Sequence, residues 1–229
     1  MKVISLLPMK GHSERVPNKN MKNFNGIPLY HTIVNSLLAS KYIESIVIDT
    51  DSKLIAEDAK KNFGDKIIII NRPIGIQGDF VSMNDIIDYD LSEIEGEHFL
   101  QTHSTNPLLT NKTIDKAIEK YFKELKNFDS IFSVTKVQTR FYDKNAKAIN
   151  HNPNKLLRTQ DLEPMYEENS NFYIFSKNSF KKANKKRIGI KPLVFEVNKL
   201  EAIDIDEPED FIIAELLYKN KDKLDLDKK

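Results

Sequence analysis

Residues 3–20, VISLLPMKGHSERVPNKN, join a short apolar run to a cationic loop. Residues 3–7 are aliphatic except for Ser5, and Val3 and Ile4 are β-branched, which is typical of a buried strand. The loop that follows carries Lys10, Arg15 and Lys19 together with Ser13. Because ligands bind at the carboxyl ends of strands in open parallel sheets, this stretch predicts the first strand of an α/β fold with a ligand-binding loop behind it.

The rest of the chain alternates between strand-like and helix-like segments. The apolar residues of the segments around 29–38, 55–59 and 110–121 each share one helical face, and Thr110 is placed to cap the last of them. Strands are expected between them, at residues 45–50, 66–70, 98–102 and 130–137. Such alternation predicts a parallel sheet covered by helices.

One segment breaks this order. Residues 140–164 are polar and rich in Asn and Lys, without clear periodicity, and we expect them to leave the sheet. Strands are again expected at 171–175 and 193–197, and a helix over 207–218 that begins through Pro208. No linker marks a boundary, so the expectation is one domain, residues 1–229, with 140–164 inserted in it.

Composition restricts the function. The 229 residues include 35 Lys plus Arg against 34 Asp plus Glu, so no overall charge favours nucleic acid or a membrane surface as a partner. The absence of cysteine excludes disulfides and thiolate chemistry and fits a cytoplasmic location. We expect neither a signal peptide nor a transmembrane helix. Only 7 glycines are present and no dinucleotide or Walker spacing occurs, so a phosphate site must use side chains.

The loop after the first strand has the composition of an anion site. Lys10, Arg15 and Lys19 can neutralise a polyphosphate, and Ser13 can donate to a phosphate oxygen. Gly11 lets the backbone approach a ligand closely. The alternative is a solvated basic surface loop without function.

Two aspartates near the end of the chain form the second candidate site. Asp204 and Asp206 alternate with Ile203 and Ile205, which at strand period turns both carboxylates to one face. Paired carboxylates suit Mg²⁺ shared with substrate phosphates. The alternative, an acidic helix start, explains Glu207 and Glu209 but not the paired aspartates.

Several ordered blocks resemble the acylneuraminate cytidylyltransferase family and the related CMP-KDO synthetases over nearly the whole length. Lys10, Ser13, Pro17, Lys19 and Asn20 match the family's opening loop, and Arg15 is similar to the KDO-type variant. The further blocks are GIPL at 26–29, IDTD at 48–51, STNPLLT at 104–110, ENS at 168–170 before FYIF, and IDID at 203–206 before DF at 210–211.

This resemblance implies a Rossmann-like, mostly parallel sheet with helices on both faces, and a homodimer. It implies that CTP binds over the first loop, through Lys10, Gly11, Ser13, Arg15, Lys19 and Asn20, and that Asp204 and Asp206 hold Mg²⁺. Lys10, Lys19 and Asp206 would then act in catalysis. It also implies that residues 140–164 form a dimerisation arm, with Arg158 and Asn169 as candidate ligands of the sugar carboxylate.

The implied reaction joins CMP from CTP to the anomeric hydroxyl of a 2-keto-3-deoxy sugar acid, with release of pyrophosphate, for surface polysaccharide synthesis. No general base is evident. Two departures concern recognition: Lys10 replaces the usual arginine and loses its bidentate fork, and His103 stands where sialate enzymes carry glutamine, either as a sugar contact or as a strand-end histidine bonded to backbone.

Three alternatives stay open at this point. The chain could be a nucleotidyltransferase for another sugar or an alcohol phosphate, which would keep the loop and the metal. It could be a glycosyltransferase with an Asp-x-Asp metal site, although that motif usually lies mid-chain. It could also be a non-catalytic sugar-nucleotide binding protein, since fold does not fix function. Intact Lys19, Asp204 and Asp206 argue against the last.

Overall fold

The computed structural model describes residues 1–224 and contains a seven-stranded sheet in the order β5-β4-β1-β6-β8-β7-β9. The pairs β1–β4, β1–β6, β4–β5 and β7–β9 are parallel, whereas β8 runs antiparallel to both neighbours. The expected mostly parallel α/β sheet is therefore confirmed. The strands are β1 Val3–Leu6, β4 Ile43–Thr50, β5 Ile67–Asn71, β6 His98–Thr102, β7 Ser130–Val137, β8 Met165–Ser176 and β9 Pro192–Glu196, with a separate hairpin of β2 Asn23–Phe24 and β3 Ile27–Pro28.

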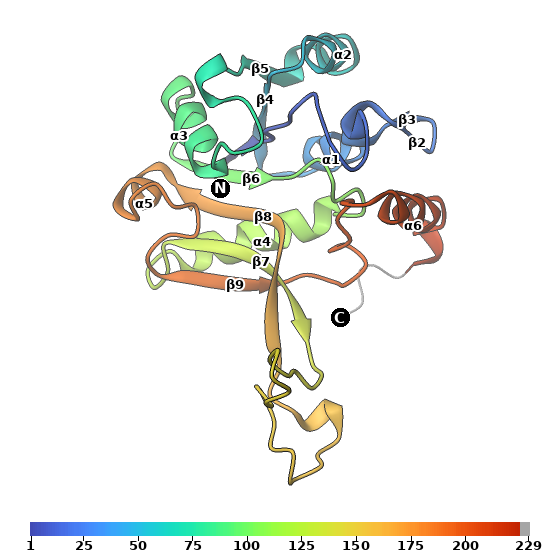
Figure 1. Cartoon of the computed structure of the whole chain (residues 1–229). Helices are drawn as coiled ribbons and strands as arrows, with labels where there is room; N and C mark the ends of the chain where they lie inside the picture. The colour runs from blue at the N-terminus through green and yellow to red at the C-terminus, as the bar shows by residue number, and fades with distance from the viewer. Residues whose placement is uncertain (225–229) are drawn as a thin grey trace.

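Helices cover both faces of the sheet (Figure 1). The apolar stripes of α1, α2 and α4 share one core cluster, which includes Ile33, Ile55 and Ile118. Those of α3 and α5 share a second, which includes Ile87 and Phe180. The six helices of the described chain are α1 Leu29–Leu38, α2 Lys53–Phe63, α3 Met83–Glu93, α4 Asn111–Glu124, α5 Lys177–Lys182 and α6 Pro208–Lys219.

Local sequence explains most helix starts. Side-chain oxygens of Ser52, Ser82 and Thr110 each accept a hydrogen bond from a backbone N–H in the first turn of α2, α3 and α4. Pro208 stands in the first turn of α6, where its missing N–H costs nothing. Thr110 therefore caps α4 as predicted.

A third, smaller core fixes the position of the two candidate site segments. Val16 from the loop after β1 and Ile205 from the segment before α6 are buried together with Phe24 and Phe211. Residues 203–206 do not pair with any strand, so the predicted strand geometry is wrong there. The segment is nevertheless held in place, because Ile205 is fully buried and its N–H donates to the Thr105 carbonyl at 3.0 Å.

Residues 138–164, here called the projecting segment, extend away from the body of the molecule together with the adjoining ends of β7 and β8 (Figure 1). They contain one short 3-10 turn, Thr159–Asp161, and one isolated bridge between Tyr142 and Ala148. The predicted excursion from the sheet at 140–164 agrees with this shape. Within the described residues, no helix has the length and apolar character needed to cross a membrane.

Candidate active site

A cleft of about 530 Å³ lies where the loop after β1 faces residues 203–206. Its wall includes Lys10, Ser13, Arg15, Lys19 and Asn20 from the first loop. Asp204, Asp206 and His103 complete the set of predicted residues that meet here. Two segments almost 190 residues apart in sequence therefore form one site at the carboxyl ends of β1 and β6, as the position of the loop predicts.

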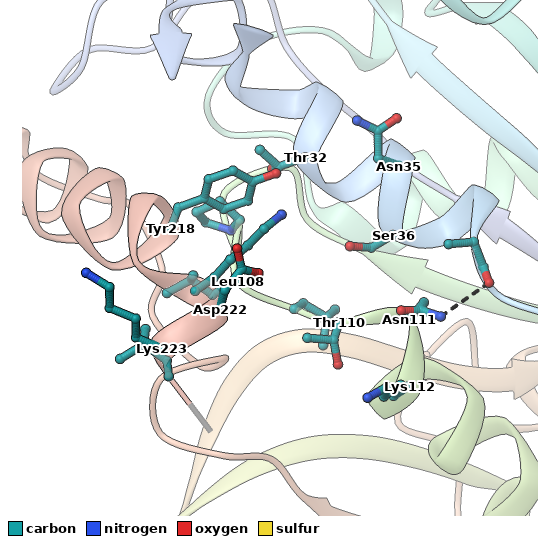
Figure 2. Close-up of a pocket in the computed structure, with 15 residues that line it drawn as sticks. Thr32, Asn35, Ser36, Leu108, Thr110, Asn111, Lys112, Tyr218, Asp222 and Lys223 are labelled. Atoms are coloured by element: carbon teal, nitrogen blue, oxygen red, sulfur yellow. Dashed lines mark hydrogen bonds between the residues drawn. The ribbon is translucent and has the colours of Figure 1, made fainter. Parts of the chain in front are cut away.

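A larger pocket of about 720 Å³ opens among α1, the start of α4 and the residues after α6 (Figure 2). Thr32, Tyr218 and Lys223 line it, but none of the candidate site residues does. Its one hydrogen bond drawn in the figure joins Asn111 Nδ2 to the Ala39 carbonyl at 3.3 Å. The smaller cleft concentrates cations and carboxylates, and we take it as the active site.

Lys19 is the most enclosed of the three cations that the first loop contributes to the cleft. Its side chain is 13% exposed, against 43% for Lys10 and 54% for Arg15. Its ammonium donates to the Ile205 carbonyl at 2.5 Å and lies 3.9 Å from Asp206 Oδ1. Burial lowers the pKa of Lys19, and the charges of Asp204 and Asp206 oppose that shift. The group is thus a fixed positive charge directed at the two aspartates.

The two exposed cations are paired with carboxylates. Arg15 donates to Asp206 and to Glu207, both at 2.8 Å. Lys10 forms an ion pair with Asp79, whose pKa it lowers through the hydrogen bond and its charge. A polyphosphate that enters the cleft can replace these carboxylates as the partner of both cations, because the ion pairs are solvent-exposed and weak.

Asn20 and Gly11 have structural contacts that the sequence did not indicate. Asn20 donates to the Lys10 carbonyl at 3.0 Å and accepts from the Ser104 hydroxyl at 2.6 Å, which ties the first loop to the loop after β6. The Gly11 N–H donates to Asp51 at 2.7 Å, and a Cβ at Gly11 would lie 2.8 Å from that of Ser52. Gly11 therefore packs against the start of α2, beside the cleft.

The two aspartates differ in their surroundings. Asp204 Oδ1 is buried without a hydrogen-bond partner, whereas the Asp206 side chain is 51% exposed. Burial and the charge of Asp206 raise the pKa of Asp204, against a hydrogen bond from Thr105 and the charge of Lys19. An unpartnered carboxylate oxygen beside a second carboxylate fits a hard divalent cation. No group of three or more His, Cys, Asp or Glu able to hold a metal occurs among residues 1–224, so the remaining ligands would come from substrate and water.

The predicted sugar ligands separate in the structure. His103 lies in the cleft, with Nε2 buried and unpartnered, and burial together with the charges of Arg187 and Lys19 lowers its pKa to about 4. Arg158 lies in the projecting segment and pairs with Asp161 at 2.8 and 3.1 Å. Asn169 donates to the Thr135 hydroxyl at 3.0 Å between β8 and β7. Only His103 of the three thus reaches the cleft of its own chain.

Arg72 and the segment around Asp79 also line the cleft, and the sequence did not point to them. Arg72 is 6% exposed and donates to Asp49 Oδ1 at 2.9 Å. A usable signal existed, because Arg72 directly follows β5, and strand ends are where ligand contacts gather in such sheets.

Comparisons with known proteins identify the family of this chain. A family model described as cytidylyltransferase matches residues 4–226. A pseudaminic acid cytidylyltransferase of Campylobacter jejuni subsp. jejuni serotype O:2 is 26% identical over 232 residues, 96% of this chain and 97% of that protein. An N-acylneuraminate cytidylyltransferase of Streptococcus agalactiae serotype III is 26% identical over 221 residues, 93% of this chain and 52% of that protein.

Solved structures support the fold. A CMP:2-keto-3-deoxy-manno-octonic acid synthetase complexed with CTP superposes with a TM-score of 0.70 at 12% identity, covering 96% of this chain and 100% of that one. A 4-diphosphocytidyl-2C-methyl-D-erythritol synthase from Anaerococcus prevotii gives 0.66 at 14% identity, covering 95% and 96%. The resemblance inferred from the sequence blocks is confirmed by the family match, and the chain belongs to the cytidylyltransferase family, a family of nucleotidyltransferase enzymes.

Proposed function

We propose that this enzyme transfers CMP from CTP to the anomeric hydroxyl of a 2-keto-3-deoxy sugar acid and releases pyrophosphate. One observation carries the proposal: Lys10, Arg15 and Lys19 meet Asp204 and Asp206 around a single cleft. The names of the similar proteins, which act on pseudaminic and N-acylneuraminic acids, support a sugar acid as the acceptor.

The residues of the cleft can bind and orient a triphosphate. Lys19 is held by the Ile205 carbonyl, so its charge is already in place before the nucleotide binds. Lys10 and Arg15 can exchange their exposed carboxylate partners for phosphate oxygens. Charge neutralisation and in-line positioning are the main requirements of phosphoryl and nucleotidyl transfer, because the reaction needs no covalent enzyme intermediate.

Mg²⁺ is the proposed cofactor, held by Asp204 and Asp206. When bound, it would neutralise negative charge on the triphosphate and on the leaving pyrophosphate. Arg15 bonds the Asp206 carboxylate at 2.8 Å in the protein alone, so part of the repulsion between the two aspartates is already relieved by a side chain.

A homodimer is the proposed assembly. The projecting segment exposes large apolar side chains, among them Leu156 at 87%, Ile149 at 56% and Tyr142 at 52%. Exposed apolar groups on an extended segment favour a protein partner. A second copy would cover them, and it would bring Arg158 toward the partner's cleft, where its guanidinium suits the carboxylate of a sugar acid.

The proposed location is the cytoplasm, which the lack of cysteine fits.

A pyrophosphate-release assay tests the proposal. The four nucleoside triphosphates are each combined with N-acylneuraminic acid, pseudaminic acid, KDO and methylerythritol phosphate, with and without Mg²⁺. We expect pyrophosphate release only when CTP is the nucleotide and one of the sugar acids is the acceptor. Release only with methylerythritol phosphate would move the assignment to an alcohol-phosphate acceptor, and no release with any pair would reject it.

A further inference from the structure

A buried cluster of two carboxyl groups and one guanidinium lies behind the wall of the cleft. Asp49 is near the end of β4, Arg72 follows β5, and Asp90 belongs to α3. Asp49 and Asp90 are 0% exposed and Arg72 is 6% exposed. Three separate elements thus meet through ionisable side chains in an interior where unpaired charge is costly.

Arg72 connects this cluster to the cleft. Its Nε donates to Asp49 Oδ1 at 2.9 Å, and its Nη2 donates to the Asp49 carbonyl at 3.2 Å and the Met9 carbonyl at 3.5 Å. The same residue forms part of the cleft wall. Asp49 therefore fixes one edge of the Arg72 guanidinium, and Arg72 faces the proposed nucleotide site.

Three carboxyl oxygens of the cluster lack a donor. Asp49 Oδ2 and both oxygens of Asp90 are buried, with no hydrogen-bond partner in the described chain. Buried acceptors left unpaired are expensive, and two carboxylates against one arginine would also leave a buried negative charge. One proton on Asp90 removes the excess negative charge, and its O–H can donate to Asp49 Oδ2.

The surroundings of Asp90 favour that proton. Burial raises the pKa of Asp90 to about 9. The hydrogen bond that a protonated Asp90 can make to Asp49, and the charge of Asp49, act in the same direction, and only the charge of Arg72 opposes them. Tyr89 on the same helix stays neutral, because burial and the charges of Glu93, Asp49 and Asp90 raise its pKa. The cluster then carries one positive charge, one negative charge and one neutral acid.

We propose that Asp90 is a positioning residue of the nucleotide site: its neutral carboxyl group donates a hydrogen bond to Asp49, and Asp49 in turn holds Arg72 in the cleft wall, where it can donate to an acceptor oxygen of the nucleotide. This inference rests on the proposed function for the identity of the nucleotide. The shared proton itself does not depend on it.

The first experiment compares Asp90→Asn with Asp90→Leu. Asparagine keeps a neutral group that donates to Asp49, whereas leucine has a similar size and no donor. At neutral pH, Asp90→Asn should keep the KM for CTP within about twofold of the parent, and Asp90→Leu should raise it about tenfold, the effect of losing one hydrogen bond, with a smaller change in kcat. The matched control is Asp88→Leu on the same helix, whose exposed partner is Lys185, and it should leave the KM unchanged.

The second experiment needs no substrate. Between the ordinary pKa of aspartate, about 4, and about 9, folded Asp90 holds a proton that the unfolded chain lacks, so the stability of the parent falls as pH rises through this range. Asp90→Asn has no such group. The thermal midpoint of Asp90→Asn should therefore rise relative to that of the parent from pH 5 to pH 9. The parent at pH 8 should also show the infrared carbonyl band of a protonated carboxylic acid, and Asp90→Asn should lose it.

Three results would overturn the inference: a parent-like KM for Asp90→Leu, an Asp90→Asn variant as impaired as Asp90→Leu, or a midpoint difference that does not change with pH. If Asp90→Leu does not fold, the pH profile and infrared band of Asp90→Asn still decide. If the parent turns over CTP with no acceptor, the proposed function fails, while the midpoint profile continues to test the shared proton separately.

Discussion

Lys19 is the residue on which we expect the proposed nucleotide site to depend most, because its ammonium is enclosed and already directed at the cleft by the Ile205 carbonyl. We expect Lys19→Met to weaken CTP binding by about 1.5–3 kcal/mol, the value of a hydrogen bond to a charged group. Isothermal calorimetry with CTP measures it. Lys22→Met is the control, since Lys22 lies over the Phe211 ring outside the cleft. Equal affinities for Lys19→Met and the parent would remove Lys19 from the phosphate site.

Asp206 is the residue that tests the proposed metal site. Asp206→Asn preserves size but removes one charged ligand, so turnover should fall by at least about tenfold and recover in part at high Mg²⁺. The thermal midpoint should stay close to that of the parent, because the pair that Asp206 makes with Arg15 is exposed and contributes at most about 1 kcal/mol.

The control for Asp206 is Glu209→Gln, which removes an exposed acid from the first turn of α6. Its turnover should match that of the parent at every Mg²⁺ concentration. Turnover is measured against Mg²⁺ concentration for the parent, Asp206→Asn and Glu209→Gln. Parent-like turnover by Asp206→Asn would reject Asp206 as a ligand of Mg²⁺.

His103 gives a prediction about acid stability. Burial, with Arg187 and Lys19, lowers its pKa to about 4, while the unfolded chain has the ordinary histidine value of about 6.5. Between these values the unfolded state binds the extra proton, so the folded state loses stability as pH falls. Glutamine cannot be protonated there. The thermal midpoint of His103→Gln should therefore rise relative to the parent from pH 7 to pH 5, and a constant difference would show that His103 is not held neutral.

At the scale of elements, Glu201 joins the segment that carries the aspartates to the start of α4. It is 1% exposed, and its carboxylate accepts from the Thr110 N–H at 2.8 Å and the Thr113 hydroxyl at 2.7 Å. Its own carbonyl accepts from Asn171 at 2.7 Å. The aspartate segment is thus anchored to both α4 and β8.

Glu201→Ala should lower the free energy of unfolding by about 2–3 kcal/mol, because it leaves buried donors at the helix start without an acceptor. Urea denaturation measures this. Glu57→Ala, in an exposed i,i+4 pair with Lys53, should change the same quantity by less than about 0.5 kcal/mol. Similar values for the two variants would mean that Glu201 does not anchor the segment.

Helices and strands whose buried side chains follow a regular apolar pattern could be predicted from the sequence. Elements that bury a charged side chain, or that are buried over only half of their length, could not. Residues 98–102 and 130–137 match β6 and β7, because each short run carries buried apolar side chains such as Leu100 and Ile131. α3 was missed because a carboxyl group, Asp90, occupies its buried stripe beside Ile87. β8 extends from Met165 to Ser176, so it begins well before the predicted strand at 171–175. Its first half was missed because it lies exposed beside β7.

The candidate site divides in the same way. Lys19, Asp204 and Asp206 could be found because charged residues follow or alternate with apolar ones in two short blocks. Asp204 and Asp206 reach the cleft through an unpaired segment anchored by Ile205, which strand periodicity alone does not describe. Arg72 was missed because its role depends on burial against Asp49, a contact 23 residues away.

For the whole molecule, the projecting segment raises the question of where Arg158 acts. In its own chain Arg158 pairs with Asp161 in that segment, which extends away from the body of the molecule (Figure 1), and Arg158 does not line the cleft. A contribution to a sugar site therefore requires a second copy, related by the two-fold symmetry that most dimers have. The intact protein should be a dimer by light scattering at micromolar concentration.

Replacing residues 140–164 by Asn-Gly leaves a four-residue connection between the paired Val137 and Met165. This variant should be a folded monomer, because the ladder between β7 and β8, from Ser130 to Val137, lies outside the deletion. Mixing two inactive variants tests the shared site directly. A mixed dimer of Arg158→Ala and Lys19→Met has one cleft with an intact Lys19 that faces an intact Arg158 from the other chain. Mixed and re-equilibrated subunits should recover part of the parent turnover. A monomeric parent, or no recovery from subunits shown to exchange, would place Arg158 outside the site.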